Sequence, residues 1–265
     1  MVAMKSSEPG WRWAGPLLAV AVAAVALASW RGADATGPEA SGPPGPAGER
    51  RLAIGAHVYR NDVAGRGANP MTTAPVDTRA SGSTFVVFAG SGIAGETAFE
   101  SVSDSLGNAY VEVGVPELYA GGEGELRAFL CRDCRGGKGH TWSLHKTASL
   151  SNWETVLFAV EVLGAPGLDA FAQANARTSP LSAGAVTTRK AGDLLLACAL
   201  AASYGTPDVY TPSAGFAVLD EQTNGTNSLA GADAWARAGS PGSYAGALAS
   251  SLGSSGAFFL VALSP

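Results

Sequence analysis

The sequence predicts an all-β protein folded as an antiparallel two-sheet sandwich. Short runs rich in β-branched and aromatic residues recur from Leu52 onward, and clusters of Gly, Ser, Pro and Asn separate them. Amphipathic helical patterns are missing, apart from weak ones over 163–177 and 233–238. The expected strands are 53–60, 83–89, 97–103, 109–115, 126–131, 141–147, 155–163, 169–174, 193–201, 216–221, 228–236, 244–250 and 257–263.

Residues 1–35 are predicted to be a secretory signal peptide or an N-terminal anchor. Lys5 and Arg12 precede an uncharged, Ala-rich and Val-rich run over 14–30, and small-x-small cleavage patterns end at Ala28 and Ala35. Because this run of 17 residues is at the lower limit for crossing a bilayer, an uncleaved anchor helix is the alternative. Either interpretation predicts a secreted or extracytoplasmic protein, with membrane contact only through residues 14–30.

Residues 36–50 are a Pro/Gly-rich linker, and residues 51–265 are expected to form one β-sandwich domain. The linker lacks apolar periodicity, which is typical of an extended spacer. The domain is long enough to bury a sizeable core, and 46% hydrophobic against 15% charged residues argues against disorder. A formal net charge of −5 argues against nucleic-acid binding.

The stretch over 101–113, SVSDSLGNAYVEV, is expected to form strand, tight turn and strand. Asp104, Gly107 and Asn108 make the turn motif. Asp and Asn side chains hydrogen-bond nearby backbone groups, and Gly tolerates positive φ. The β-rich pattern ends at Val102 and resumes at Tyr110, so the turn lies between two strands.

Four runs are apolar on both faces, over 85–88, 156–163, 194–200 and 258–263. A half-exposed strand alternates, so these four are expected to be central strands whose outer faces are covered by loops, another layer or another chain. Ala159, Ala197 and Ala199 lie on the second faces. These alanines leave two interpretations open, a plain Ala-rich outer surface or a flat interface for oligomer assembly.

Taken together, these elements resemble a family of uncharacterised bacterial secreted β-sandwich modules with a D-S-x-G-N-x-Y turn motif. The resemblance implies a jelly-roll or immunoglobulin-like sandwich, often found beside carbohydrate-active or adhesive domains. It implies no catalytic residue, and the Cys-x-x-Cys pair departs from the usual pattern. The matching pieces are STFVVFAG (83–90), SVSDSLGNAYVEV, LRAFLCRDCRGGKGHTWSL (126–144), TVLFAVEVLG (155–164), LDAF (168–171), TTRKAGDLLLACAL (187–200), AGFAVLDEQ (214–222), SYAGALASS (243–251) and GAFFLVAL (256–263).

Cys131 and Cys134 are predicted to form a local disulfide rather than half of a zinc site. His140 and His145 follow them, but five residues between Cys134 and His140 are too few for a typical two-Cys, two-His site. On one strand, two residues of opposite parity also point to opposite faces. An oxidising compartment favours the disulfide, and Cys198 is expected to be a buried thiol. We therefore expect no metal and no cofactor.

Catalytic patterns are missing from the sequence. It contains neither Gly-x-Ser-x-Gly nor a phosphate-binding glycine loop. Carboxylates such as Glu112 and Glu161 fall on expected strands, where an outward carboxylate is ordinary. The protein is predicted not to be an enzyme, with a jelly-roll polysaccharide-cleaving enzyme as the trailing alternative.

Aromatic residues beside turns are the remaining candidates for a binding site, because sugar-binding sandwiches stack flat rings on pyranose faces. Tyr119 and Trp153 are the candidate ligand-binding residues, whereas Trp142 alternates with Leu144 and is expected in the core. The resulting hypothesis is an extracytoplasmic binding or structural module, glycan-binding or adhesive, with polysaccharide or cell-surface components as partners. A self-assembling structural surface protein is the alternative.

Overall fold

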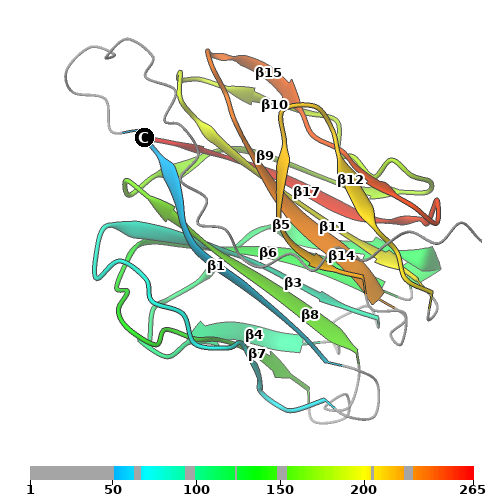
Figure 1. The fold of residues 1–265 in the computed structure, drawn as a ribbon, viewed down its shortest axis with the longest axis horizontal. Helices are drawn as coiled ribbons and strands as arrows, with labels where there is room; N and C mark the ends of the chain where they lie inside the picture. The colour runs from blue at the N-terminus through cyan, green and yellow to red at the C-terminus, as the bar shows by residue number, and fades with distance from the viewer. Residues whose placement is uncertain are drawn as a thin grey trace, which may run out of the picture. The chain divides into compact units, whose positions relative to one another are not determined.

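The computed structural model of the protein describes residues 51–62, 67–92, 99–122, 124–147, 154–203, 206–223 and 229–265. Regular structure in these residues is β-strand apart from one 3-10 turn, η1 (Ala120–Gly122), so the all-β prediction is confirmed (Figure 1). Neither weak helical pattern forms a helix. They fall in strands β9 (Gly167–Ala176) and β14 (Leu229–Arg237), which pair with antiparallel neighbours. The signal, anchor and linker predictions lie outside the described residues. Among the described residues, no helix is long and apolar enough to cross a membrane.

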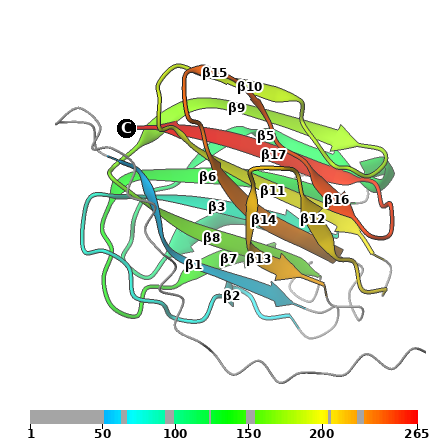
Figure 2. The ribbon, with the colours of Figure 1, turned by 45° about the horizontal axis from the view of Figure 1, so that its top comes forward.

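Two five-stranded antiparallel sheets stack face to face (Figures 1 and 2). Their facing side chains form one core, in which Phe88 and Phe158 of the first sheet meet Leu196 and Phe259 of the second. The first sheet has the order β1 (Ala53–Asp62), β8 (Thr155–Leu163), β3 (Ser83–Ser91), β6 (Gly124–Cys134) and β5 (Val111–Tyr119). The second has the order β13 (Ala217–Gln222), β14 (Leu229–Arg237), β11 (Leu194–Ala202), β17 (Gly256–Ser264) and β9 (Gly167–Ala176).

Smaller sheets cover the outer face of each large sheet. The outer face of the first sheet packs against the order β2 (Met71–Thr72), β7 (Trp142–Lys146) and β4 (Phe99–Asp104). The outer face of the second packs against two pairs, β10 (Ala185–Thr188) with β15 (Gly242–Ala245) and β12 (Tyr210–Pro212) with β16 (Leu248–Ser250). Twelve of the thirteen expected strands are present, but the strand expected over 244–250 is two strands, β15 and β16, which pair with different partners. The sequence also missed the short β2, β10 and β12.

These outer layers explain the four runs that are apolar on both faces. Strands β3, β8, β11 and β17 carry the runs, and each is flanked by two strands of its sheet. Their second faces are covered by another layer of the same chain, so Ala159, Ala197 and Ala199 are buried. Both interpretations of these alanines, a plain Ala-rich outer surface and a flat assembly interface, were therefore wrong, whereas the expected covering by another layer is present.

The two halves of the described chain repeat one strand plan. The long strands are β1, β3, β5, β6 and β8 in the first half and β9, β11, β13, β14 and β17 in the second. In each half the first long strand pairs with the last, the last with the second, the second with the fourth and the fourth with the third. The register of pairing also corresponds, since Val87 pairs with Ala159 and its counterpart Ala197 with Leu260.

A short sequence repeat marks this duplication. Residues 76–82 read VDTRASG and residues 186–192 read VTTRKAG. Both segments end in a glycine with positive φ, 73° at Gly82 and 80° at Gly192, a conformation that costs other residues about 1–2 kcal/mol. Each is preceded by a cis proline, Pro70 or Pro180.

The free edges of the large sheets are joined in a way that matches a pseudo-two-fold relation between the halves. Strand β5 of the first half lies beside β9 of the second, and β1 lies beside β13. At one seam the Gln173 amide bonds both backbone groups of Val115, at 3.0 and 2.9 Å. At the other, His57 Nδ1 lies 3.0 Å from Asp220 Oδ2. At the β5–β9 contact, the Gln173 side chain therefore satisfies backbone groups that a further strand would otherwise pair.

Candidate functional site

The predicted turn motif lies where the chain passes from the outer layer to the first large sheet. Strand β4 ends at Asp104 and pairs with β7, whereas β5 begins at Val111 and pairs with β6. The order strand, turn, strand is present, but the two strands are not a hairpin. The Gly107 amide donates to the Asp104 carbonyl at 3.3 Å, and Gly107 has a φ of 69°, which favours glycine.

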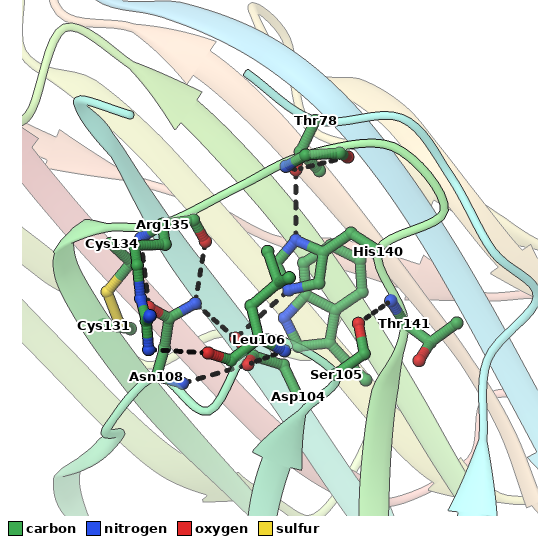
Figure 3. A network of polar contacts seen from close by, with 12 residues as sticks. Thr78, Asp104, Ser105, Leu106, Asn108, Cys131, Cys134, Arg135, His140 and Thr141 are labelled. Atoms are coloured by element: carbon green, nitrogen blue, oxygen red, sulfur yellow. Dashed lines mark hydrogen bonds and ion pairs between the residues drawn. A yellow bond between two sulfur atoms is a disulfide. The ribbon is translucent and has the colours of Figure 1, made fainter. Parts of the chain in front are cut away.

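The Asp104 carboxylate organises this turn (Figure 3). Its Oδ1 accepts the backbone amides of Leu106 and Asn108, both at 3.0 Å. Its Oδ2 accepts the Asn108 amide side chain at 2.7 Å and the Tyr110 hydroxyl at 2.9 Å. A carboxylate offers about four acceptor sites, so these four bonds use its capacity.

The buried His140 ring completes this group, which we call the Asp104 network (Asp104, Asn108, Tyr110, His140 and Trp142). The His140 Nε2 atom lies 3.2 Å from Asp104 Oδ2, close enough for an ion pair but without the alignment of a hydrogen bond. Its Nδ1 lies 3.1 Å from the Thr78 hydroxyl. The Trp142 ring stacks on His140 at 4.2 Å, and its Nε1 donates to Tyr110 at 2.7 Å.

Ionisation in the Asp104 network follows from these contacts. Burial raises the pKa of Asp104, but the contacts from His140, Asn108 and Tyr110 outweigh burial and hold this pKa below its ordinary value. Burial and the negative Asp104 charge raise the pKa of Tyr110. Asp104 is thus held ionised and Tyr110 protonated, as the hydrogen bond from Tyr110 requires.

Asn108 also connects the turn to the end of β6. Its Nδ2 donates to the Arg135 carbonyl at 2.8 Å, and its Oδ1 accepts the Arg135 amide at 3.0 Å. The Arg135 guanidinium donates to the Leu106 carbonyl at 2.8 Å. A disulfide joins Cys131 and Cys134 just before this contact (Figure 3). These polar groups already have partners within the protein. They therefore hold the chain where it passes from β4 to β5, and few of their donors and acceptors remain for a ligand.

Of the two candidate ligand-binding residues, Tyr119 lies in the part of the chain that the structure describes. Tyr119 is 1% exposed and donates its hydroxyl to the Ser91 carbonyl at 3.0 Å, so the expectation that its ring is exposed was wrong. The ring is covered because β5 ends inside the main core, opposite Gly124. Trp153 lies outside the described residues. Trp142 is fully buried, as predicted.

The two histidines that were considered as metal ligands are separated from each other. His140 contacts Thr78 and Asp104, whereas His145 Nε2 lies 2.7 Å from the Ser103 hydroxyl. Within the part of the chain that the structure describes, no three His, Cys, Asp or Glu residues form a group that could hold a metal ion. Cys198 is a buried free cysteine, and burial raises the pKa of its thiol well above the ordinary value.

Glu161 differs from the sequence-based expectation of an outward carboxylate. It is 2% exposed, and its oxygens accept the Ala56 amide at 3.0 Å, the Arg79 amide at 2.9 Å and the Ser83 hydroxyl at 2.5 Å. Period-two patterning does not separate an exposed carboxylate from one that pairs with backbone amides distant in sequence. Glu112, in contrast, is exposed on β5.

Exposed apolar side chains occur on β5 and β9, and we call the place where the edges of these two strands lie side by side the β5–β9 seam. Of the eight large exposed hydrophobic residues in the described chain, five lie on these two strands: Val111, Val115, Leu118, Leu168 and Phe171. Phe171 is 43% exposed, and its ring lies close over Gly114, where an added Cβ would come within 2.9 Å of Cε2. The missing side chain at Gly114 therefore lets the ring lie against the β5 backbone.

No family model, curated protein or solved structure matches this chain.

Proposed function

We propose that this chain is an extracytoplasmic binding module, glycan-binding or adhesive at the cell surface, and that it consists of two jelly rolls. The proposal is supported in the first half by the strand order β1-β8-β3-β6 in the large sheet with β2-β7-β4 in the outer one, which is the order of a jelly roll. The second half repeats the large-sheet order as β9-β17-β11-β14, with its outer strands in two separate pairs. The family resemblance suggested by the turn motif supports the same proposal, an extracytoplasmic module of jelly-roll type. Export would depend on residues 1–35, and the intact mass of protein recovered from the culture medium would report cleavage after Ala28 or Ala35.

The observation that carries this proposal is the β5–β9 seam. A soluble protein seldom gathers exposed apolar side chains on one edge without a partner for them. Phe171 offers a flat ring supported by the Gly114 backbone. On β5, Glu112 is exposed and can accept hydrogen bonds from sugar hydroxyls, whereas Glu117 already accepts the Gln173 side-chain amide at 3.0 Å. This combination of an exposed ring and polar groups is the chemistry of weak glycan stacking.

Affinity electrophoresis of the exported protein through gels that contain bacterial or plant polysaccharides tests this function. Phe171→Ala should weaken retention about two- to tenfold, because one stacked ring supplies roughly 0.5–1.5 kcal/mol. The matched control is Tyr59→Ala, which removes another partly exposed ring, on β1, and should leave retention unchanged. Absence of retention on polysaccharides and on intact cells would overturn the proposal, and release of reducing ends would reveal an enzyme instead.

A further inference from the structure

Two carboxyl groups meet at a corner of the second half where β9 packs against the turn between β10 and β11. Asp169 in β9 accepts the Arg189 backbone amide at 2.9 Å and the Arg189 Nε at 2.5 Å. Asp193 follows this turn and is fully buried. Its side chain interacts with that of Asp169, and neither of its oxygens has a well-aligned hydrogen-bond donor among the described residues, although the Lys190 backbone amide lies close enough to lower its pKa. A buried carboxylate in that position would be costly.

The corresponding corner of the first half has a hydroxyl where the second half has the Asp193 carboxyl group. Arg79 corresponds to Arg189 in the repeated segment, and its backbone amide is likewise capped by a buried carboxylate, that of Glu161. Ser83, at the position of Asp193, donates its hydroxyl to Glu161. Each half thus places a capping carboxylate beside a second polar side chain. In the first half that side chain is a hydroxyl, which keeps its proton throughout the biological pH range.

We propose that Asp169 and Asp193 share one proton, and that this pair is a pH-dependent latch between β9 and the β10–β11 turn. With the proton present, Asp193 donates to Asp169 as Ser83 donates to Glu161. When the proton is lost to water, two negative charges face each other in a site closed to solvent. The latch is therefore closed in acid and weakened at neutral pH.

Charged groups from the neighbouring elements determine where the change occurs. Arg189 binds Asp169, and Lys190 lies close enough to Asp193 to lower its pKa. Lys190 also donates to the Pro265 carbonyl at 2.7 Å, Arg237 of β14 donates to the Gly192 carbonyl at 3.4 Å, and Tyr244 of β15 interacts with Asp193. Burial, and then the Asp169 charge, raise the pKa of Asp193 to about 6 despite Lys190. Burial alone would raise the pKa of Asp169, but the bonds from Arg189 lower it overall.

The direction of the pH effect follows from these shifts. The ordinary pKa of Asp193 is 3.8, so between about pH 4 and pH 6 the folded protein holds a proton that the unfolded chain has lost. Stability due to Asp193 is complete below this window and falls as the pH rises through it. The ratio of folded to unfolded protein should fall about tenfold, with roughly hundredfold as the upper bound. Asp169, with its lowered pKa, acts oppositely, and its contribution is lost only at lower pH.

Urea unfolding of the full chain from pH 4.5 to 7.5, with Asp193→Ser and Ser83→Asp as reciprocal variants, tests the latch. Asp193→Ser reproduces the first half and should remove the part of the fall between pH 4.5 and 6.5 that is due to Asp193, while any contribution from the buried Asp233 stays the same in both proteins. Ser83→Asp should add a comparable fall. If Asp193→Ser does not fold, Asp193→Asn supplies an uncharged donor and has the same expected profile.

Carbon-13 NMR of the wild-type Asp side-chain carboxyl groups provides a test that needs no destabilised protein. One carboxyl should titrate near pH 6, and this transition should be absent from the Asp193 variant that folds. Wild-type protein in which every Asp carboxyl titrates below pH 5 would overturn the proposal. A pH-dependent loss of stability that persists unchanged in the Asp193 variants would also overturn it.

Discussion

The two halves of this protein have the same strand plan but differ in their buried polar side chains and in the hydrogen bonds that these make. In the first half the outer layer contains the stacked, buried His140 and Trp142 above an ionised Asp104. In the second half Tyr244 pairs with Val186 as His140 pairs with Val76 in the first. The Tyr244 hydroxyl donates to the carbonyl of the nearby Ser240 at 2.7 Å. The turn after β12 is closed by Ser213, whose hydroxyl accepts the Ala247 amide at 3.1 Å.

The inner core shows the same contrast. Phe88 pairs with Ala128 in the first half, whereas Cys198 pairs with Asp233 at the corresponding position of the second. Burial, and then the Asp220 charge, raise the pKa of Asp233 well above its ordinary value. Oδ1 of Asp233 accepts the Asp220 amide at 2.9 Å. The comparison of the two halves shows that a shared pattern of apolar strand pairs is enough to give both halves the same strand order. Buried polar side chains differ between the halves, and each is paired by residues near it.

The largest expected effect is the loss of the Asp104 network, which only the first half has. Asp104→Ala leaves the Tyr110 hydroxyl, the Asn108 amide and His140 without their shared acceptor, and should cost about 3–5 kcal/mol in urea unfolding at pH 7. Because the pKa of Asp104 is lowered in the folded state, its contribution should be lost as the pH falls below about 4.

Ser213→Ala is the matched change in the second half, where one hydroxyl acceptor is lost. It should cost about 1 kcal/mol. If Asp104→Ala lowers the free energy of unfolding no more than Ser213→Ala does, the Asp104 network does not hold the chain between β4 and β5.

The Cys131–Cys134 disulfide should have the next largest effect. It spans an irregularity in the β3–β6 register, with Asp133 at a φ of 49°, whereas the corresponding β11–β14 ladder is regular. The closed loop is very short, so replacing both cysteines with Ala should cost about 2 kcal/mol or less. Labelling of the denatured, unreduced protein should modify Cys198 alone, and modification of three cysteines would contradict the bond.

The last prediction concerns the repeated glycines and tests how closely the halves correspond. Gly82→Ala and Gly192→Ala place a side chain at positive φ in otherwise open space, so each should cost about 1–2 kcal/mol. Gly137→Ala is the control, because it also meets no atom within 4 Å and its φ is not in the left-handed region. Clearly unequal costs at Gly82 and Gly192 would weaken the claim of a shared strand plan.

The sequence predicted the features that depend on local pattern. Period-two alternation and turn residues located the long strands, and runs apolar on both faces identified β3, β8, β11 and β17 as central. Spacing and compartment led to the prediction of a bond between Cys131 and Cys134, which the structure contains. The repeat of VDTRASG as VTTRKAG was also available in the sequence, and it would have predicted the duplication.

Only the tertiary structure decided which of these residues are buried and what they contact. Tyr119 is beside a turn in sequence, yet it is covered because the two large sheets close over the end of β5. Glu161 and Asp104 acquire their roles from amides, hydroxyls and rings brought in by other strands. Whether Asp193 keeps its proton likewise depends on Asp169, which is near it only in the folded chain. Pairing across long sequence separations is a property of packing, and no periodicity within a single strand encodes it.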